Sequence, residues 1–271
     1  MNPTPGDMPY RIDLPALDDR AFDRLVGLGA LDVELTTEGR TAALMPDRVA
    51  PDEISSALGV TVLGVAPAEE RDAGSVWVLS PRPVRVGGVT IVPAHHQSGP
   101  GTIRLTDARA FGTGLHATTT LCLQTIHDVV GHAPPSTVLD VGTGSGVLAL
   151  AALTLGVPRA VGLDIDPEAM TAAAANARLN DLGSRLHLVH GGPAAVIGAW
   201  PLVMANLLTG PLLELAPELV RRVGHRGQLL LSGIRASTRS EVENAYVRWG
   251  MQCIASSARD GWLALLLQAS W

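Results

Sequence analysis

The 271-residue chain contains no lysine, and all 20 of its basic residues are arginine. It has only two cysteines, Cys122 and Cys253, which stand far apart without a CxxC pair. Neither a disulfide framework nor a zinc site can be built from them, so we expect reduced thiols, a cytoplasmic protein and no metal. Aromatic residues are scarce, with five Trp, two Tyr and two Phe, so the core must be aliphatic. No apolar run approaches the roughly 18 residues of a membrane span, and Met1–Tyr10 lacks the apolar stretch of a signal peptide.

Negative charge is concentrated in one part of the chain. Residues 10–70 carry five arginines against twelve acidic residues, whereas residues 111–271 carry ten against eleven. An acidic surface repels phosphate and attracts basic partners. The distribution therefore disfavours direct binding of nucleic acid by the N-terminal segment. It indicates either a basic protein partner or an ordinary solubilising charge.

The sequence pattern divides the chain into two regions that differ in their predicted order of strands and helices. Residues 1–9 are interpreted as a flexible tail, and short strands and helices over residues 10–68 predict the order βαββαβ, a small ferredoxin-like α+β domain. Residues 69–100 are rich in Pro, Gly and Ser and are interpreted as a linker. Over residues 101–271, apolar strands alternate with helices and end in a hairpin with an Asp-Gly tip. This second pattern predicts an α/β fold with a Rossmann-like, mostly parallel seven-stranded sheet.

A glycine-rich turn follows the first predicted strand of that sheet and opens the next helix. It reads Asp140-Val-Gly142-Thr-Gly144-Ser-Gly146. Glycines let the backbone approach a ligand closely, and the helix start offers free N–H groups. A dinucleotide fingerprint would need a further glycine where Val147 stands, so the spacing favours S-adenosylmethionine, which has no pyrophosphate. The alternative is a strand-to-helix turn without a ligand.

Polar residues also follow two neighbouring predicted strands. Asp164 lies 22 residues after Gly142, where a carboxylate can accept both ribose hydroxyls of S-adenosylmethionine or of NAD. Asp166 precedes a proline and is interpreted as a helix cap. Asn206 follows the fourth strand of the sheet. Its carbonyl and a backbone carbonyl can accept two hydrogens of an amine and aim its lone pair at a methyl group. The alternative is that Asn206 only caps the next helix.

Four segments together resemble the PrmA family of class I methyltransferases, which methylate ribosomal protein L11. They are residues 107–123, 140–150, 162–167 and 206–217. The stretches Phe-Gly-Thr-Gly-x-His-x-Thr-Thr, here with Phe111 and His116, and Asn-Leu-Leu-x-Gly-Pro-Leu-x-Glu-Leu-Ala-Pro are specific signatures of this family. A weaker likeness extends upstream through Trp77, Pro83, Arg85, Gly87 and Pro93. Ala117 departs from the family pattern, which usually has proline after the histidine.

The resemblance implies an S-adenosylmethionine-dependent protein N-methyltransferase that acts on lysine ε-amines or the N-terminal α-amine of L11. It further implies that the N-terminal domain binds this basic protein substrate, in agreement with its acidic charge. Phe111 would lie over the active site, and Asn206 would orient the amine. The role of His116 stays open between a ligand, a base and a structural residue. The expected cofactor-binding residues are Thr119, Asp140, Gly142, Gly144, Gly146, Asp164 and Asn206.

Three alternatives remain at this point. A paralogue could keep the C-terminal motifs and methylate another protein or peptide. A non-catalytic adaptor could use the acidic domain to bind a basic protein, although the intact glycines, Asp164 and Asn206 argue against it. A NAD dehydrogenase is disfavoured by Val147. We expect a monomer that binds neither nucleic acid nor membrane directly.

Overall fold

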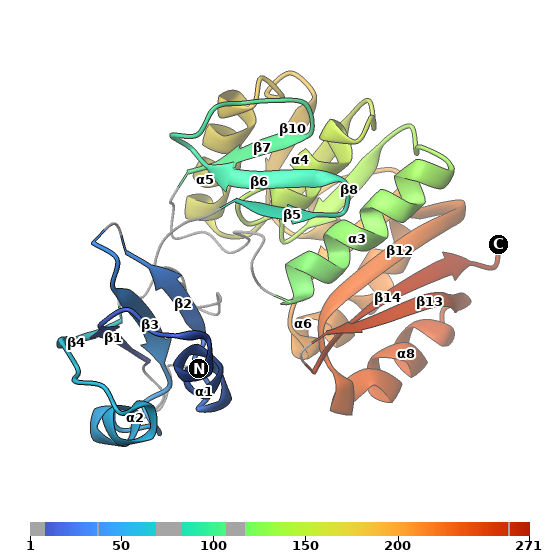
Figure 1. The fold of residues 1–271 in the computed structure, drawn as a ribbon. Coiled ribbons are helices and arrows are strands. Elements are labelled where there is room, and N and C mark those ends of the chain that lie inside the picture. The colour runs from blue at the N-terminus through green and yellow to red at the C-terminus, as the bar shows by residue number, and fades with distance from the viewer. Residues whose placement is uncertain (1–8, 37, 69–82, 107–116, 260) are drawn as a thin grey trace. The chain divides into compact units, whose positions relative to one another are not determined.

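The computed structural model describes most of the chain (Figure 1). The described residues are 9–36, 38–68, 83–106, 117–259 and 261–271. The chain divides into two compact units, residues 1–81 and residues 82–271. Within the described ranges, no helix combines the length and the apolar character needed to cross a bilayer.

The first unit has the βαββαβ order that its sequence pattern predicts. Its elements are β1 (Tyr10–Leu14), α1 (Asp19–Gly27), β2 (Asp32–Leu35), β3 (Thr41–Met45), α2 (Pro51–Leu58) and β4 (Gly64–Pro67). The sheet order is β2-β3-β1-β4, and β1 pairs antiparallel with both β3 and β4. Ile12, Leu25, Met45 and Ile54 are fully buried in its core. The ferredoxin-like prediction is therefore confirmed.

The second unit contains a seven-stranded sheet in the order β10-β9-β8-β11-β12-β14-β13. Its strands are β8 (Val138–Val141), β9 (Ala160–Asp164), β10 (Leu186–His190), β11 (Trp200–Asn206), β12 (Val223–Arg235), β13 (Met251–Arg259) and β14 (Trp262–Ala269). The pairs from β10 through β12 are parallel, whereas β14 runs antiparallel to both of its neighbours. This confirms the mostly parallel sheet with a C-terminal hairpin.

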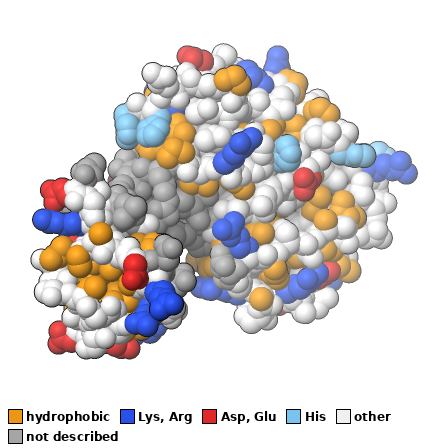
Figure 2. All heavy atoms as spheres, viewed as in Figure 1, with side chains coloured by type: hydrophobic (Ala, Val, Ile, Leu, Met, Phe, Trp, Pro, Cys, Tyr) orange, Lys and Arg blue, Asp and Glu red, His pale blue; other side chains and the backbone are white. Residues whose placement is uncertain are grey.

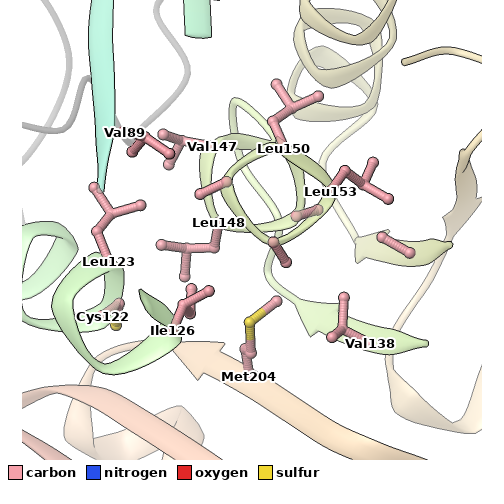
Figure 3. Packing of buried hydrophobic residues seen from close by; sticks show 14 of the residues in the cluster. Val89, Cys122, Leu123, Ile126, Val138, Val147, Leu148, Leu150, Leu153 and Met204 are labelled. Carbon is pink, nitrogen blue, oxygen red and sulfur yellow. The ribbon is translucent and has the colours of Figure 1, made fainter. Parts of the chain in front are cut away.

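Helices cover both faces of this sheet (Figure 1). They are α3 (Ala117–His132), α4 (Val147–Thr154), α5 (Pro167–Leu179), α6 (Thr209–Glu214), α7 (Ala216–Arg221) and α8 (Arg239–Val247), with short 3-10 turns at Pro193–Ala195 and Ala236–Thr238. The helical segment that follows β11 is divided at Leu215 into α6 and α7. Ile126 of α3 and Leu148 of α4 lie toward Met204 of β11 in the aliphatic core, whereas Leu123 of α3 points toward Val89 of β6 (Figure 3).

The expected linker over residues 69–100 is only partly consistent with the structure. Residues 69–82 lie outside the described residues, but β5 (Val84–Val86), β6 (Val89–Pro93) and β7 (Thr102–Leu105) form a three-stranded sheet within the second unit. Val86, Val89 and Ile91 are buried in the same cluster as the side chains of α3 and α4. The prediction is therefore corrected: the larger unit begins near residue 82, before the expected boundary at residue 101.

Gly87 and Gly88 form the tight turn between β5 and β6. Gly87 has a φ of 54°, and a Cβ atom there would lie 2.1 Å from the carbonyl oxygen of Leu123 in α3. The turn between β5 and β6 thus packs directly on the helix backbone, which only glycine permits.

Candidate functional site

The polar residues predicted from strand ends lie at one edge of the seven-stranded sheet. Strands β9, β8 and β11 are adjacent and parallel. Asp164, the glycine turn after Val141 and Asn206 therefore stand at the carboxyl ends of three neighbouring strands. Open α/β sheets bind ligands outside this edge. The topology thus brings together residues that are up to 64 positions apart in the chain.

The glycine turn has a backbone shape that other residues adopt at a cost. Gly142, Gly144 and Gly146 have φ values of 71°, 54° and 83°, in the left-handed region. A Cβ atom on Gly142 would lie 2.4 Å from Cδ2 of Leu207, so the turn packs against the residue that follows Asn206. The glycine turn and the Asn206 turn therefore lie in direct contact.

Asp164 ties its own strand to the glycine turn. Its Oδ2 accepts a hydrogen bond from the backbone N–H of Gly144 at 2.9 Å, and its Oδ1 accepts one from that of Asp166 at 3.0 Å. Each carboxylate oxygen can accept a further hydrogen bond. Asp166 is the N-cap of α5, and its side chain accepts from the backbone N–H of Glu168 at 2.8 Å, which confirms its interpretation as a helix cap.

Asp140 is a buried carboxyl group with one unsatisfied oxygen. Its Oδ2 accepts from the hydroxyl of Thr143 at 2.7 Å and from the N–H of Ala149 at 3.3 Å, whereas Oδ1 has no partner in the described part of the chain. Burial raises the pKa of Asp140 from 3.8 to about 6, the nearby charge of Asp164 adds to the shift, and the two hydrogen bonds oppose it. The ionised form is therefore a cost to the fold, as is common at sites that bind ligands.

Replacing Asp140 by asparagine is expected to stabilise the protein at pH 7. The folded-state pKa lies above the unfolded value, so the wild type loses stability as pH rises from about 4 to about 6, and the loss is complete at pH 7. Asparagine keeps an acceptor for Thr143 and Ala149 without the charge. We expect a free energy of unfolding about 2–3 kcal/mol higher at pH 7 and a much smaller difference at pH 3.5 or so. Urea unfolding of both proteins at the two pH values measures this, and equal differences would contradict it.

Asn206 ends β11 with its side chain half-buried. Its amide makes no hydrogen bond with the described residues. The alternative that it caps the next helix is wrong, because α6 begins at Thr209 with Leu208 as its N-cap and without a side-chain cap. The backbone N–H of Leu207 donates to the carbonyl of Ser232 at 3.1 Å, which fixes the start of the turn.

Gly233 was missed by sequence reasoning. Its φ is 84°, and a Cβ atom there would lie 2.0 Å from the carbonyl oxygen of Leu207. The pairing of β12 with β14 shifts between Ser232 and Ile234, as at a β-bulge. Gly233 therefore lets β12 pass close to the turn that carries Asn206. A glycine inside an apolar strand indicates a bulge or a close backbone approach at that position, although it does not identify the segment that approaches.

Helix α3 brings Thr119 to the same region. The hydroxyl of Ser232, which pairs in register with Asn206, lies 3.5 Å from the carbonyl oxygen of Thr118. Thr119 is fully buried, and its Oγ1 has no partner among the described residues. Phe111 and His116 lie outside the described residues, so their roles stay predictions.

Ile165 is a second residue that sequence reasoning missed. It follows Asp164 and is 77% exposed. The imidazole Nε2 of His190, at the end of β10, lies 2.9 Å from the carbonyl oxygen of Ile165. A large apolar side chain that is exposed next to a carboxylate offers a surface for a flat apolar group.

Within the described ranges, no group of three or more His, Cys, Asp or Glu side chains is placed to hold a metal ion.

The chain is similar to known proteins. The model of the ribosomal protein L11 methyltransferase (PrmA) family matches residues 48–270. The ribosomal protein L11 methyltransferase of Chromohalobacter salexigens is 41% identical over 201 residues, which cover 72% of this chain and 66% of that protein. The one of Geobacter metallireducens is 38% identical over 211 residues, which cover 76% and 69%. These matches span about two thirds of the length of the relatives.

A solved structure gives the same result. The crystal structure of a ribosomal protein L11 methylase from Lactobacillus delbrueckii subsp. bulgaricus aligns with a TM-score of 0.62 at 34% identity. The alignment covers 68% of this chain and 96% of that one. The chain therefore belongs to the ribosomal protein L11 methyltransferase (PrmA) family, whose members are S-adenosylmethionine-dependent methyltransferases.

Proposed function

We propose that this chain transfers a methyl group to a nitrogen of ribosomal protein L11, either a lysine ε-amine or the N-terminal α-amine. The observation that carries the proposal is the amide of Asn206, which lies at the ligand-binding edge of the sheet without a hydrogen-bond partner among the described residues. An amide oxygen in this place can accept a hydrogen from a neutral amine and leave the nitrogen lone pair free. S-adenosylmethionine supplies a methyl group already activated by its sulfonium, so positioning provides much of the catalysis.

The residues at the sheet edge fit S-adenosylmethionine. The glycine turn forms a cradle in which a side chain on Gly142 would collide with Leu207. Asp164 keeps acceptor capacity for the ribose hydroxyls. Thr119 and Asp140 each hold a buried oxygen without a partner in the described chain, available for a polar group of the cofactor.

Replacing Asp164 by alanine is expected to weaken the binding of S-adenosylmethionine. The loss of a charge-assisted contact is worth about 1.5–3 kcal/mol, which raises Kd by roughly 10- to 150-fold. Calorimetry measures the affinity. Asp166→Ala is a matched control, because it removes a helix cap two positions away and should leave Kd within about threefold while costing about 1 kcal/mol of stability. An unchanged Kd for Asp164→Ala would remove this residue from the site.

The side chain of Asn206 is neutral, which matters because the substrate amine must be deprotonated before it can attack the methyl group. A lysine amine with a pKa of about 10.4 must lose its proton before it attacks, which costs about 4–5 kcal/mol at pH 7. Burial of the amine reduces this cost. A carboxylate would stabilise the ammonium form instead, whereas an amide oxygen accepts from the neutral amine without that penalty.

We assign docking of the protein substrate to the ferredoxin-like unit. Asp47, Asp52 and Glu53, around the start of α2, are exposed and form no ion pair with the described residues. Acidic side chains occur at several places on the visible face of this unit (Figure 2). Such a surface steers a basic ribosomal protein toward the enzyme. A ribosomal substrate places the reaction in the cytoplasm.

A second candidate is a paralogue that methylates another protein. The family match begins at residue 48, which leaves most of the ferredoxin-like unit outside it. Incubation with labelled S-adenosylmethionine and ribosomes that lack the modification, followed by mass spectrometry, distinguishes the two. Label on L11 supports the proposal, and label on a different protein supports the paralogue. If this chain binds the substrate but transfers no label to it, the result supports the non-catalytic adaptor.

A further inference from the structure

We propose that Asn176 is a positioning residue that holds the glycine turn in its binding-competent shape. This inference rests on the proposed function, because it concerns the same S-adenosylmethionine site. Asn176 lies in the middle of α5, where its neighbours on the buried face are alanines. It is completely buried. A polar side chain at such a position needs hydrogen-bond partners, and the identity of those partners indicates its role.

The amide of Asn176 connects two segments that are distant in the chain. Its Nδ2 donates to the backbone carbonyl of Ser145 in the glycine turn at 2.9 Å. Its Oδ1 accepts from the backbone N–H of Thr106 at 2.8 Å and lies 2.9 Å from the hydroxyl of the same residue. Because a backbone N–H can only donate, the oxygen of the amide must face Thr106 and the nitrogen must face Ser145.

A second asparagine binds the same edge strand at a neighbouring position. Asn180, one helical turn later, accepts from the backbone N–H of Arg104 at 2.8 Å and donates to its carbonyl at 2.7 Å. The two asparagines therefore satisfy backbone groups of Arg104 and Thr106, which are two residues apart and face the same side of an extended chain. Asn176 and Asn180 thus bind the free edge of β7 to α5. Of these two residues, only Asn176 also forms a hydrogen bond with the glycine turn.

The glycine turn benefits from this support because its glycine residues restrict the conformation of the backbone little. Three glycines in the left-handed region have much conformational freedom. If nothing ordered them beforehand, the entropy lost on ordering them would reduce the binding free energy of the ligand. Asp164 holds the turn from one side through the N–H of Gly144. Asn176 holds it from the other side through the carbonyl of Ser145. The packing is close here as well, since a Cβ atom on Gly146 would lie 3.3 Å from that of Ala173.

Matched substitutions on α5 test the proposal. Asn176→Asp keeps an acceptor for Thr106 but places an oxygen against the carbonyl of Ser145, whereas Asn180→Asp makes the same change one turn away, without contact with the turn. Both variants should lower the unfolding temperature. At a temperature well below both transitions, calorimetry with S-adenosylmethionine should give a Kd at least tenfold above wild type for Asn176→Asp and within threefold for Asn180→Asp.

The outcomes separate this inference from a general loss of stability. A Kd within threefold of wild type for Asn176→Asp, or an equal rise in both variants, would overturn it. If Asn176→Asp does not fold, Asn176→Ser, which is too short to reach both partners, is judged by the same two criteria. Wild-type protein that fails to bind S-adenosylmethionine would instead contradict the proposed function. Normal wild-type binding with an unchanged Asn176 variant contradicts only the positioning role.

Discussion

Replacing Asn206 by alanine is expected to lower kcat at least about 100-fold while Kd for the protein substrate changes little. In the proposed function, the amide would hold one amine in line with a methyl group, and a displacement of about 1 Å at a reacting centre can cost that factor. The backbone of the turn should persist, because it is fixed by the bond from Leu207 to Ser232 and by the close approach of Gly233. Single-turnover kinetics with labelled S-adenosylmethionine separates the chemical step from binding.

Two further variants make this result specific. Asn206→Asp conserves the shape but adds a negative charge that favours the protonated amine, so its activity should be low at pH 7 and recover partly as pH rises. Asn244→Ala, at an exposed position of α8, is the matched control and should keep kcat within threefold. If Asn206→Ala also stays within threefold of wild type, Asn206 is a residue of the turn without a part in methyl transfer.

Removal of the ferredoxin-like unit is expected to abolish methylation of intact L11 while S-adenosylmethionine binds normally. The truncated chain should begin at Arg82, because β5 and β6 contribute Val86, Val89 and Ile91 to the core of the larger unit. A chain that begins near Pro100 would lose these side chains and expose that core. Loss of a linked docking unit lowers effective substrate concentration by roughly 100- to 10,000-fold, which methylation rates at low substrate concentration would detect.

A charge variant tests the same role in the full-length chain. Neutralising Asp47, Asp52 and Glu53 to the corresponding amides should slow association with L11, and the difference from wild type should shrink as salt concentration rises. Neutralising the exposed Glu214 and Glu241 of the larger unit is the control. Full-rate methylation of intact L11 by the truncated chain would show that docking does not depend on residues 10–68.

Much of the fold and part of the site could be predicted because their determinants are local. Strands β8, β9 and β11 are mostly apolar and end at or just before a glycine or a polar residue, and parallel neighbours bring their carboxyl ends together. Asp164 and Asn206 could be located by their place after such runs. Asp166 was recognised as a cap from its neighbour Pro167. Each of these predictions depends on a few consecutive residues whose conformational preferences are strong.

Only the tertiary structure decided which short segments belong together. Strands β5 to β7 have three to five residues, too few for composition to distinguish a sheet from a linker, and their burial depends on α3 and α4. The last strand of the ferredoxin-like unit begins at Gly64, where its pairing with β1 begins. Likewise, β12 extends over Val223–Arg235, beyond its apolar residues, because β11 and β14 pair with it on both sides.

The same limit applies to the residues that support the site. The sequence determined the glycine turn and the polar strand ends, because backbone freedom and side-chain type are properties of single positions. It could not indicate that Gly233 meets the carbonyl of Leu207, or that Asn176 joins Thr106 to Ser145. Such contacts form between segments 26 to 70 positions apart. They exist only after the sheet and its helices have packed, so tertiary structure alone decides them.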